Sequence, residues 1–170
     1  MGMEMMSSAM VPLRSSPEFV NLVTTFENPL IGILVGAGFT AIIQSSSASV
    51  GILQALAMSG VITLPSAIYV LFGQNIGTCI TAVLASIGTG RNAKRTTIIH
   101  LSFNIIGTIV FVFISMLTPF ASFMQSLTPT NIPAQIANVH TVFNVVTTLL
   151  LLPFGAQLVK LSYLVLPEKE

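Results

Sequence analysis

Apolar residues fill most of the chain from residue 28 to residue 158, and short polar clusters divide them into segments. Within residues 28–62, the apolar arms NPLIGILVGAGFTAII and ASVGILQALAMSG flank the polar run QSSS. Neither arm reaches the roughly 20 apolar residues that span a membrane, yet together they exceed one span. Irregular backbone at membrane depth needs a covering of protein or water, which a polar tip can supply. We therefore interpret residues 28–62 as a re-entrant helical hairpin, in preference to one long helix with a polar patch.

Three more apolar segments follow this hairpin, and the first has polar and small residues near its middle. The pattern predicts a helix over residues 65–88, interrupted at GQNIGT by Gly73, Gln74, Asn75, Gly77 and Thr78. A discontinuous helix of this kind is typical of transporter binding sites. Close helix packing through Gly73 and Gly77 explains the glycines but not the amides. Residues 96–117 and 134–158 predict two further transmembrane helices.

Both ends of the chain differ from its apolar middle. Residues 15–27 predict a short amphipathic helix, with Ser16 as its cap and Pro17 at its first position. We place this helix at the membrane surface, although an ordinary linker helix has the same pattern. Residues 1–14 are expected to be the end of a truncated helix, and residues 159–170 a polar cytoplasmic tail.

The composition assigns these segments to a membrane. Hydrophobic residues make up 53% of the chain and charged residues 6%, whereas soluble domains carry about 25% charged residues. No charged residue occurs from Asn28 to Gly90 or from Thr96 to Val159. The sequence therefore predicts an all-α integral membrane protein.

Charge also predicts how the chain is oriented. Lys and Arg favour the cytoplasmic side of a membrane. If the loop before residue 96 lies inside, five of the six basic residues share that side, namely Arg91, Lys94, Arg95, Lys160 and Lys169, and Arg14 lies outside. We therefore expect a multi-pass protein of the cell (inner) membrane with a cytoplasmic C-terminus, and not one that inserts in both directions.

Two short stretches, HLSFNIIGT from His100 and HTVFNVVTT from His140, repeat one pattern. In each, His and Asn lie four residues apart and so share one helix face. Because neither helix has an acidic residue, structural hydrogen bonding is favoured over a metal site or a proton relay. No carboxylate lies between Glu27 and Glu168, which excludes most acid–base and triad chemistry, so we do not expect an enzyme.

The motifs QSSS, GQNIGTCITAVLASIG and RNAKRTTIIHLSFNIIGT resemble the sodium-dependent inorganic phosphate cotransporters, specifically the bacterial members related to the animal type II cotransporters. The resemblance extends from Gly2 to about Leu164. It implies a symporter built from two inverted repeats, each with a QSSS hairpin and a G-x-N-I-G-T helix. This chain has one copy of each motif and resembles the second repeat only. The implied function is sodium-coupled phosphate transport, to which this chain supplies one half of the site.

The resemblance also implies the site residues. Phosphate would be bound by the hairpin tip, at Gln44, Ser45, Ser46 and Ser47. Sodium, the coupling ion, would be bound by Gln44, Ser45, Asn75, Thr78 and Thr81. A half-helix beginning near Ser46 offers free N–H groups to an anion, and sodium offsets its charge where no basic residue is present. The alternative is that both motifs only hydrogen-bond neighbouring helices.

The single set of motifs raises a question about partners. The expected partners are inorganic phosphate, sodium, the lipid bilayer and a second repeat unit, with no cofactor and no nucleic acid. That second unit could be a separate first-repeat chain, a missing first half or another copy in a homodimer, which the charge bias disfavours. The alternative function is a non-transporting fragment or partner subunit.

Overall fold

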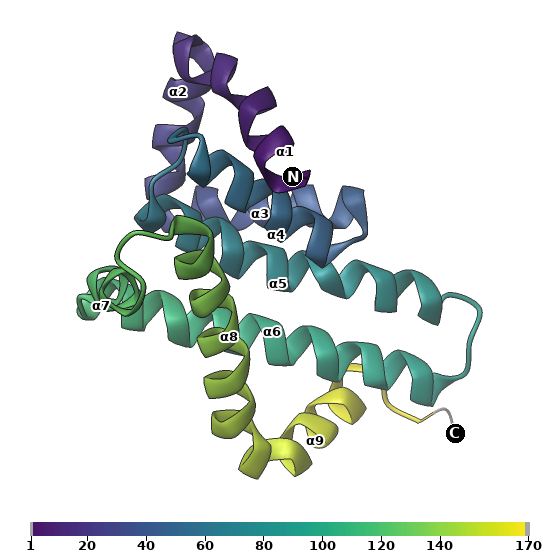
Figure 1. The fold of residues 1–170 in the computed structure, drawn as a ribbon. Helices are drawn as coiled ribbons and strands as arrows, with labels where there is room; N and C mark the ends of the chain where they lie inside the picture. Colours follow the sequence, from purple (N-terminus) through teal and green to yellow (C-terminus); the bar gives the residue numbers. More distant parts are fainter. Residues whose placement is uncertain (1, 169–170) are drawn as a thin grey trace.

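The computed structural model describes residues 2–168, and every regular element among them is a helix (Figure 1). Helices α5 and α6 lie side by side, α3 and α4 cover α5, and α8 crosses the pair before α9 turns back toward α6 (Figure 1). The α-helices are α1 Gly2–Met10, α2 Pro17–Thr24, α3 Pro29–Ile43, α4 Ser46–Met58, α5 Leu64–Ser86, α6 Arg91–Leu117, α7 Phe120–Leu127, α8 Ile132–Leu151 and α9 Gly155–Val165. The 3-10 helices are η1 Val11–Ser15, η2 Thr25–Glu27 and η3 Leu152–Phe154.

Three helices are long and apolar enough to cross a membrane: α5, α6 and the stretch Ile132–Val165. A fourth span is possible if α2 with η2 and α3, which meet at 113°, form one bent element. Both arms of the hairpin are shorter, with 15 residues in α3 and 13 in α4. The prediction of an all-α membrane fold is confirmed.

The polar run separates α3 from α4, as the pattern predicted. Gln44 ends α3 in the left-handed conformation, with φ of 57°, and Ser45 caps α4 by accepting a hydrogen bond from Ala48 N. The two arms are joined across the hairpin by a buried hydrogen bond of 2.7 Å between Thr40 Oγ1 and Ser49 Oγ. Such a buried pair satisfies two hydroxyls that would otherwise be costly in an apolar surrounding.

Helix α3 packs against α5 through glycines on both helices. A Cβ atom on Gly36 would lie 2.0 Å from the carbonyl oxygen of Val70, and one on Gly73 would lie 2.0 Å from that of Ile33. Gly32 and Gly77 are similarly close to α5 and α3, respectively. Small residues let two helix backbones approach closely, which is the main source of helix association in a membrane.

The expected break in the helix over residues 65–88 is wrong. Helix α5 is continuous from Leu64 to Ser86, and its 23 residues include the whole GQNIGT motif. Close packing against α3 explains Gly73 and Gly77 without unwinding. The amide of Asn75 and the hydroxyl of Thr78 donate to carbonyls within the same helix, Leu71 O at 3.1 Å and Gln74 O at 2.8 Å. No unwound carbonyls are therefore available from this helix to bind an ion.

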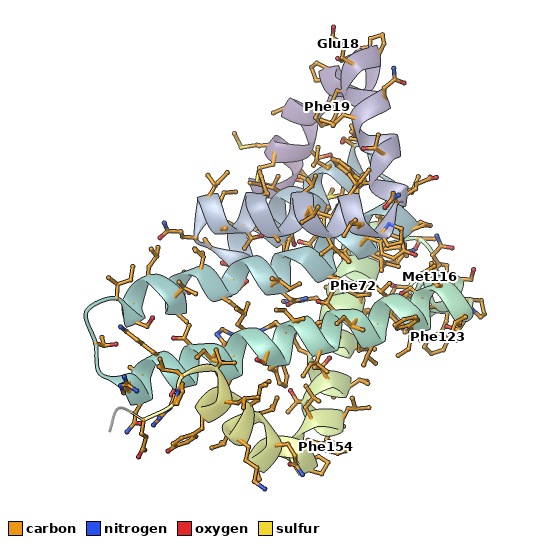
Figure 2. The ribbon with its side chains drawn as sticks, turned by 180° about the vertical axis from the view of Figure 1, so that it is seen from behind. Glu18, Phe19, Phe72, Met116, Phe123 and Phe154 are labelled. Carbon is orange, nitrogen blue, oxygen red and sulfur yellow. The ribbon has the colours of Figure 1, made fainter. Side chains whose placement is uncertain are left out.

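Aromatic side chains form the packing centre between α5, α6 and α8. Phe72, Phe111 and Phe143 are fully buried, with ring centroids 5.0–5.7 Å apart. Phe72 lies between the helices in Figure 2, whereas the labelled Met116, Phe123 and Phe154 are more than half exposed and lie on the outside. In a bilayer, the outward apolar side chains would contact lipid.

The C-terminal third departs from the predicted boundaries. The helix expected over residues 134–158 instead ends at Leu151, because Pro153 has no N–H to continue it. A second helix, α9, continues to Val165, so the predicted tail from residue 159 is largely helical, and its residues 169–170 lie outside the described part. Helix α7 lies between the predicted helices 96–117 and 134–158, where no helix was predicted, with Phe120 and Met124 buried one turn apart.

The predicted cap and first position of the N-terminal helix are confirmed. Ser16 accepts a hydrogen bond from Phe19 N and Pro17 is the first residue of α2. Residues 2–10 are helical, and α1 packs against α4. Phe19 packs on the core beside Val23 and Phe26.

We expect Ser49→Ala to destabilise the hairpin by about 1–3 kcal/mol, because Thr40 Oγ1 would remain buried without its partner. Thermal unfolding in detergent would measure the loss. Ser126→Ala is the control, since Ser126 is exposed and bonds only within its own helix turn. A double variant, Ser49→Ala with Thr40→Val, should recover part of the stability. Equal melting temperatures for Ser49→Ala and the control would contradict the prediction.

Candidate functional site

A polar cavity of about 310 Å³ lies where the hairpin tip meets α5, α6 and α8. Three of the residues that line it, Ser46, Asn75 and Thr78, are predicted site residues. The lining comes from four helices and consists of Ser46, Asn75, Thr78, His100, Phe103, Asn104, His140 and Asn144. Most of these side chains carry hydrogen-bonding groups, and none carries a carboxylate, a guanidinium or an ammonium group. The cavity therefore suits a small polar or ionic ligand held by neutral groups.

The α5 wall of the cavity is fixed by the amide of Asn75. Its Nδ2 donates to the Leu71 carbonyl, which can only accept, so its Oδ1 faces the other way. That Oδ1 lies 3.2 Å from Nε2 of His140 on α8. Because an amide oxygen cannot donate, the imidazole carries its hydrogen on Nε2. Asn75 thus ties α5 to α8 at the cavity.

The two copies of the His-x-x-Phe-Asn pattern face each other across this cavity. In each copy, the Asn amide donates to the carbonyl of the His four residues earlier, at 3.0 Å for Asn104 and 2.8 Å for Asn144. The expected structural hydrogen bonding is present, in these bonds and in the bond from His140 to Asn75. Sequence reasoning did not assign these residues to the ligand site, although the repeated pattern itself was the signal.

The hairpin tip contributes one side chain and a helix end. Ser46 is half-buried and lines the cavity, whereas Gln44 and Ser47 are exposed and do not line it. The hydroxyl of Ser45 is used as the cap of α4 and lies 3.4 Å from that of Ser47. The first intrahelical bond of α4 runs from Ser49 N to Ser45 O, and Ala48 N donates to the Ser45 cap, so the N–H groups of Ser46 and Ser47 remain free to bind a ligand.

Thr81 is not brought to the cavity. Its side chain is exposed, and its hydroxyl donates to Thr78 O at 2.9 Å. Thr81 lies three residues beyond Thr78 on a helix that is continuous rather than broken. Of the predicted set, the structure gathers Ser46, Asn75 and Thr78 around one cavity and leaves Gln44, Ser45, Ser47 and Thr81 outside its lining.

Gln74 faces the hairpin instead of the cavity. Its Nε2 donates to Ser49 O at 3.2 Å, and its buried Oε1 has no hydrogen-bond partner among the described residues. This side chain connects α5 to the pair formed by Thr40 and Ser49. The alternative interpretation was that both motifs only form hydrogen bonds between neighbouring helices. The contacts of Gln74 agree with that alternative, whereas Asn75 and Thr78 also line the cavity.

The described residues contain no group of three or more His, Cys, Asp or Glu side chains that could hold a metal ion. Cys79, the single cysteine, is buried behind the cavity, 3.4 Å from the amide nitrogen of Asn104. Ligands at this site would have to be bound by hydroxyls, amides, imidazoles and helix ends.

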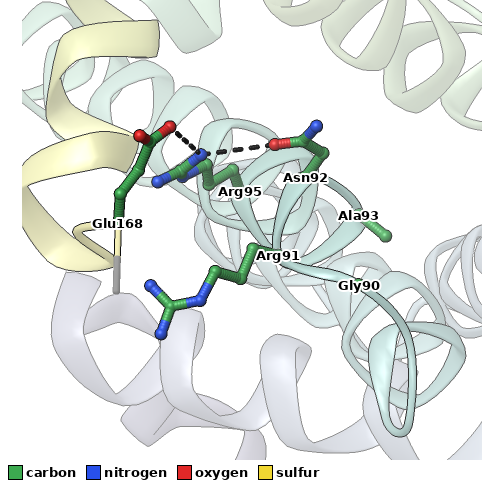
Figure 3. Close-up of a pocket in the computed structure, with 6 residues that line it drawn as sticks. All are labelled: Gly90, Arg91, Asn92, Ala93, Arg95 and Glu168. Atoms are coloured by element: carbon green, nitrogen blue, oxygen red, sulfur yellow. Dashed lines mark hydrogen bonds and ion pairs between the residues drawn. The ribbon is translucent and has the colours of Figure 1, made fainter. Parts of the chain in front are cut away.

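A second cavity, of about 440 Å³, lies at the start of α6 beside the C-terminal segment (Figure 3). Arg95 is buried, pairs with Glu168 at 3.5 Å and stacks over the ring of Tyr163 at 3.7 Å. It also donates to Leu166 O, and Arg91 donates to Pro167 O. The basic start of α6 is therefore bound to the end of the chain, and both lie on the same side of the molecule.

The profile of the Na+/Pi-cotransporter family matches residues 1–132, which include the hairpin, α5 and α6. The chain belongs to the Na+/Pi-cotransporter family. Together with this membership, the three long apolar helices indicate a membrane protein. A family of transporters is also consistent with the expectation that the chain is not an enzyme.

Several relatives of this cotransporter-family chain are much longer than it is. It is 44% identical over 138 residues to YqeW of Bacillus subtilis, a protein of uncharacterised function, covering 81% of this chain and 44% of YqeW. It is 43% identical over 84 residues to human sodium-dependent phosphate transport protein 2B, covering 47% of this chain and 12% of that protein. Mouse protein 2C is 35% identical over 133 residues, covering 74% and 21%, respectively.

The chain thus spans less than half the length of the curated relatives that it matches. No solved structure matches it significantly.

Proposed function

We propose that this chain takes part in sodium-coupled transport of inorganic phosphate and supplies one half of the substrate and ion site. The observation that carries the proposal is the meeting of both family motifs at one polar cavity, Ser46 from the hairpin tip and Asn75 with Thr78 from α5. Family membership and relatives named as sodium-dependent phosphate transport proteins support it.

Phosphate would bind at the tip of the hairpin. The N-terminus of α4 offers backbone N–H groups and the positive end of the helix dipole. The hydroxyls of Ser46 and Ser47 add hydrogen-bond donors. The hydroxyl of Ser45 and the side-chain amide of Gln44 lie in the same tip. Because Gln44 and Ser47 are exposed, they are free to contact phosphate held between this tip and a second one.

Sodium would bind beside the phosphate and offset its charge. No Lys or Arg lines the cavity, so a bound anion would otherwise be uncompensated. Neutral oxygens suit sodium, and those of Asn75 and Thr78 already lie at the cavity. Coupled binding of the two ions follows from this absence of basic side chains. Sodium is here a transported ion, and the proposal includes no cofactor.

The hairpin would be re-entrant, entering the membrane from one side and returning to it. Helices α3 and α4, with 15 and 13 residues, are each shorter than a span. The tip would then lie at membrane depth, covered by α5 and by a second repeat unit.

A partner unit completes the site in this proposal. The chain matches less than half of its relatives' length and contains one QSSS run and one GQNIGT motif. The other half would come from a separate first-repeat chain or from a preceding repeat, and less readily from a second copy of this chain. The alternative function is a partner subunit that does not transport by itself.

The membrane orientation is part of the same proposal. The basic start of α6 and the C-terminal segment contact each other through Arg91 and Arg95. Positive residues favour the cytoplasmic side, so this end of the molecule, with the C-terminus, would face the cytoplasm of a cell that carries the protein in its inner membrane.

Phosphate binding by the purified chain tests the proposal. We expect the affinity for radiolabelled phosphate in sodium chloride to exceed that in potassium chloride. The double variant Ser46→Ala with Ser47→Ala should weaken it about tenfold or more, because two donors are removed from the anion. Ser126→Ala, an exposed serine on α7, is the control. Phosphate binding that ignores both sodium and the double variant would overturn the proposal.

Phosphate uptake by cells distinguishes a chain that transports by itself from one that supplies half of the site. Cells that express this chain alone should take up little phosphate, and co-expression of a first-repeat chain should restore sodium-dependent uptake. Full uptake by the chain alone, with crosslinking that shows a monomer, would contradict the need for a second unit.

A further inference from the structure

Several side chains on the inner wall of the polar cavity have donor hydrogens that are already used, although the ring of His100, which also lines the cavity, makes no hydrogen bond to the described residues. The amide of Asn104 donates both to His100 O at 3.0 Å and to Cys79 Sγ at 3.4 Å. An amide nitrogen carries two hydrogens, so none remains for a ligand. The Oδ1 of Asn104 accepts no hydrogen bond from the described residues, and this residue lines the cavity.

Two further polar groups of this wall, on Asn144 and Thr78, also direct a donor hydrogen to a backbone carbonyl. Asn144 uses its Nδ2 on His140 O, and Thr78 uses its hydroxyl hydrogen on Gln74 O at 2.8 Å. Both bonds end on carbonyl oxygens, which only accept, so the assignment of nitrogen and oxygen in each amide follows from its partner. Thr78 therefore retains only oxygen lone pairs, whereas Asn144 retains the lone pairs of its Oδ1 and one hydrogen on Nδ2.

We infer that Asn104, Asn144 and Thr78, with Asn75 beside them, form a binding site for a monovalent cation between α5, α6 and α8. Oxygen lone pairs from three helices point to a cation as the ligand, since an anion would meet the same partial charge. The inference rests on the proposed function for the identity of the ion and adds the residues of α6 and α8 to its site.

The opposite wall of the cavity has the reverse character. It is made by Ser46 at the start of α4, where N–H groups precede the first intrahelical bond. Donors on one side and acceptors on the other would hold an anion and a cation next to each other. A volume of about 310 Å³ has room for both with water, since one water takes about 30 Å³.

The charge of the cation follows from the lack of acidic side chains. Calcium and magnesium are bound in proteins chiefly through carboxylates, and none lines this cavity. Neutral amide and hydroxyl oxygens compensate a single positive charge more readily than two. The site therefore takes an alkali ion, and sodium is the probe to use.

The test measures the melting temperature of the full chain in phosphate-free nanodiscs as sodium chloride replaces choline chloride. Ionic strength stays constant, so a rise reports sodium binding to the folded state. We expect the wild-type melting temperature to rise with sodium. In Thr78→Val, Asn104→Ala and Asn144→Ala, the half-saturating sodium concentration should increase about tenfold or more.

Matched controls lie on α8. Thr148 makes the same intrahelical bond as Thr78, to Asn144 O at 2.7 Å, but is exposed and does not line the cavity. Thr148→Val and Asn138→Ala should keep the wild-type sodium response. Thr78→Ser retains the hydroxyl, so its half-saturating sodium concentration should be well below that of Thr78→Val. If an asparagine variant fails to fold, the comparison of Thr78→Val with Thr78→Ser still decides the question.

Two results would overturn the inference: no sodium response in the wild-type chain, or an unchanged half-saturating concentration in all foldable cavity variants. Phosphate binding distinguishes this failure from failure of the proposed function. Sodium-dependent phosphate binding with no cavity effect would place the ion elsewhere and leave the transport proposal standing. A cavity-dependent sodium response without phosphate binding would support the cation site and remove the transport proposal.

Discussion

Gly73→Ala is expected to separate α3 from α5 and to abolish phosphate binding. The new Cβ would lie 2.0 Å from the carbonyl oxygen of Ile33, a backbone atom that cannot rotate away. The helices would have to move apart by more than 1 Å, at a cost of about 3 kcal/mol. Gly73 is two residues before Asn75, so the wall of the cavity would move with it. A displacement of this size at a binding site can cost about a hundredfold in function.

Gly38→Ala provides the control on the same pair of helices. A Cβ there meets no atom within 4 Å, so the substitution should leave the packing of α3 on α5 unchanged. Ala also favours a helix over Gly by about 0.5–1 kcal/mol. Melting temperature and phosphate binding should therefore be maintained in Gly38→Ala and lost in Gly73→Ala. Retained binding in both variants would show that the close approach of the helices is not required.

The hairpin could be predicted because its signals are local. A polar run between two short apolar arms predicts a break, and Ser45 caps the second arm through a bond to a residue three positions away. The same holds for Ser16 and Pro17 at the start of α2. Each feature depends on neighbours in sequence, so a single sequence contains the information.

Whether α5 is broken or continuous could not be predicted from the sequence, because glycine is compatible with both an unwound helix and a closely packed one. Gly73 and Gly77 can unwind a helix or allow another helix to approach, and only the position of α3 decides between them. Pro153 similarly marks a helix end, but the return of α9 to α6 depends on distant bonds from Arg91 and Arg95. Helix α7 was missed because its Pro and Thr flanks masked the buried pair Phe120 and Met124.

Only part of the candidate site could be predicted, because the rest depends on contacts between distant helices. Ser46, Asn75 and Thr78 belong to motifs that can be recognised in the sequence. His100 and His140 could be paired with the asparagines four residues on, but not with the cavity, because that requires α6 and α8 to face each other. Their hydrogen-bond directions, which determine the character of each wall, are a property of the folded chain alone.

Phe111→Ala is expected to lower the stability of the chain by about 3 kcal/mol, since Phe111 is 1% exposed and central to the aromatic packing. Its ring centroid lies 5.7 Å from that of Phe72, 5.8 Å from Phe120 and 5.0 Å from Phe143. Loss of the ring would leave a cavity among α5, α6 and α8 that their packed backbones cannot close. Thermal unfolding in nanodiscs would measure the change.

Phe113→Ala makes the same chemical change two residues further along α6, where the ring is 59% exposed. In a membrane that ring contacts lipid, which can fill the vacated space, so we expect a melting temperature close to that of the wild type. The contrast also bears on the site. Phe143 directly precedes Asn144, so loosening the aromatic packing should weaken sodium binding in Phe111→Ala but not in Phe113→Ala. Equal losses of stability in the two variants would mean that packing at the centre of these helices does not hold them together.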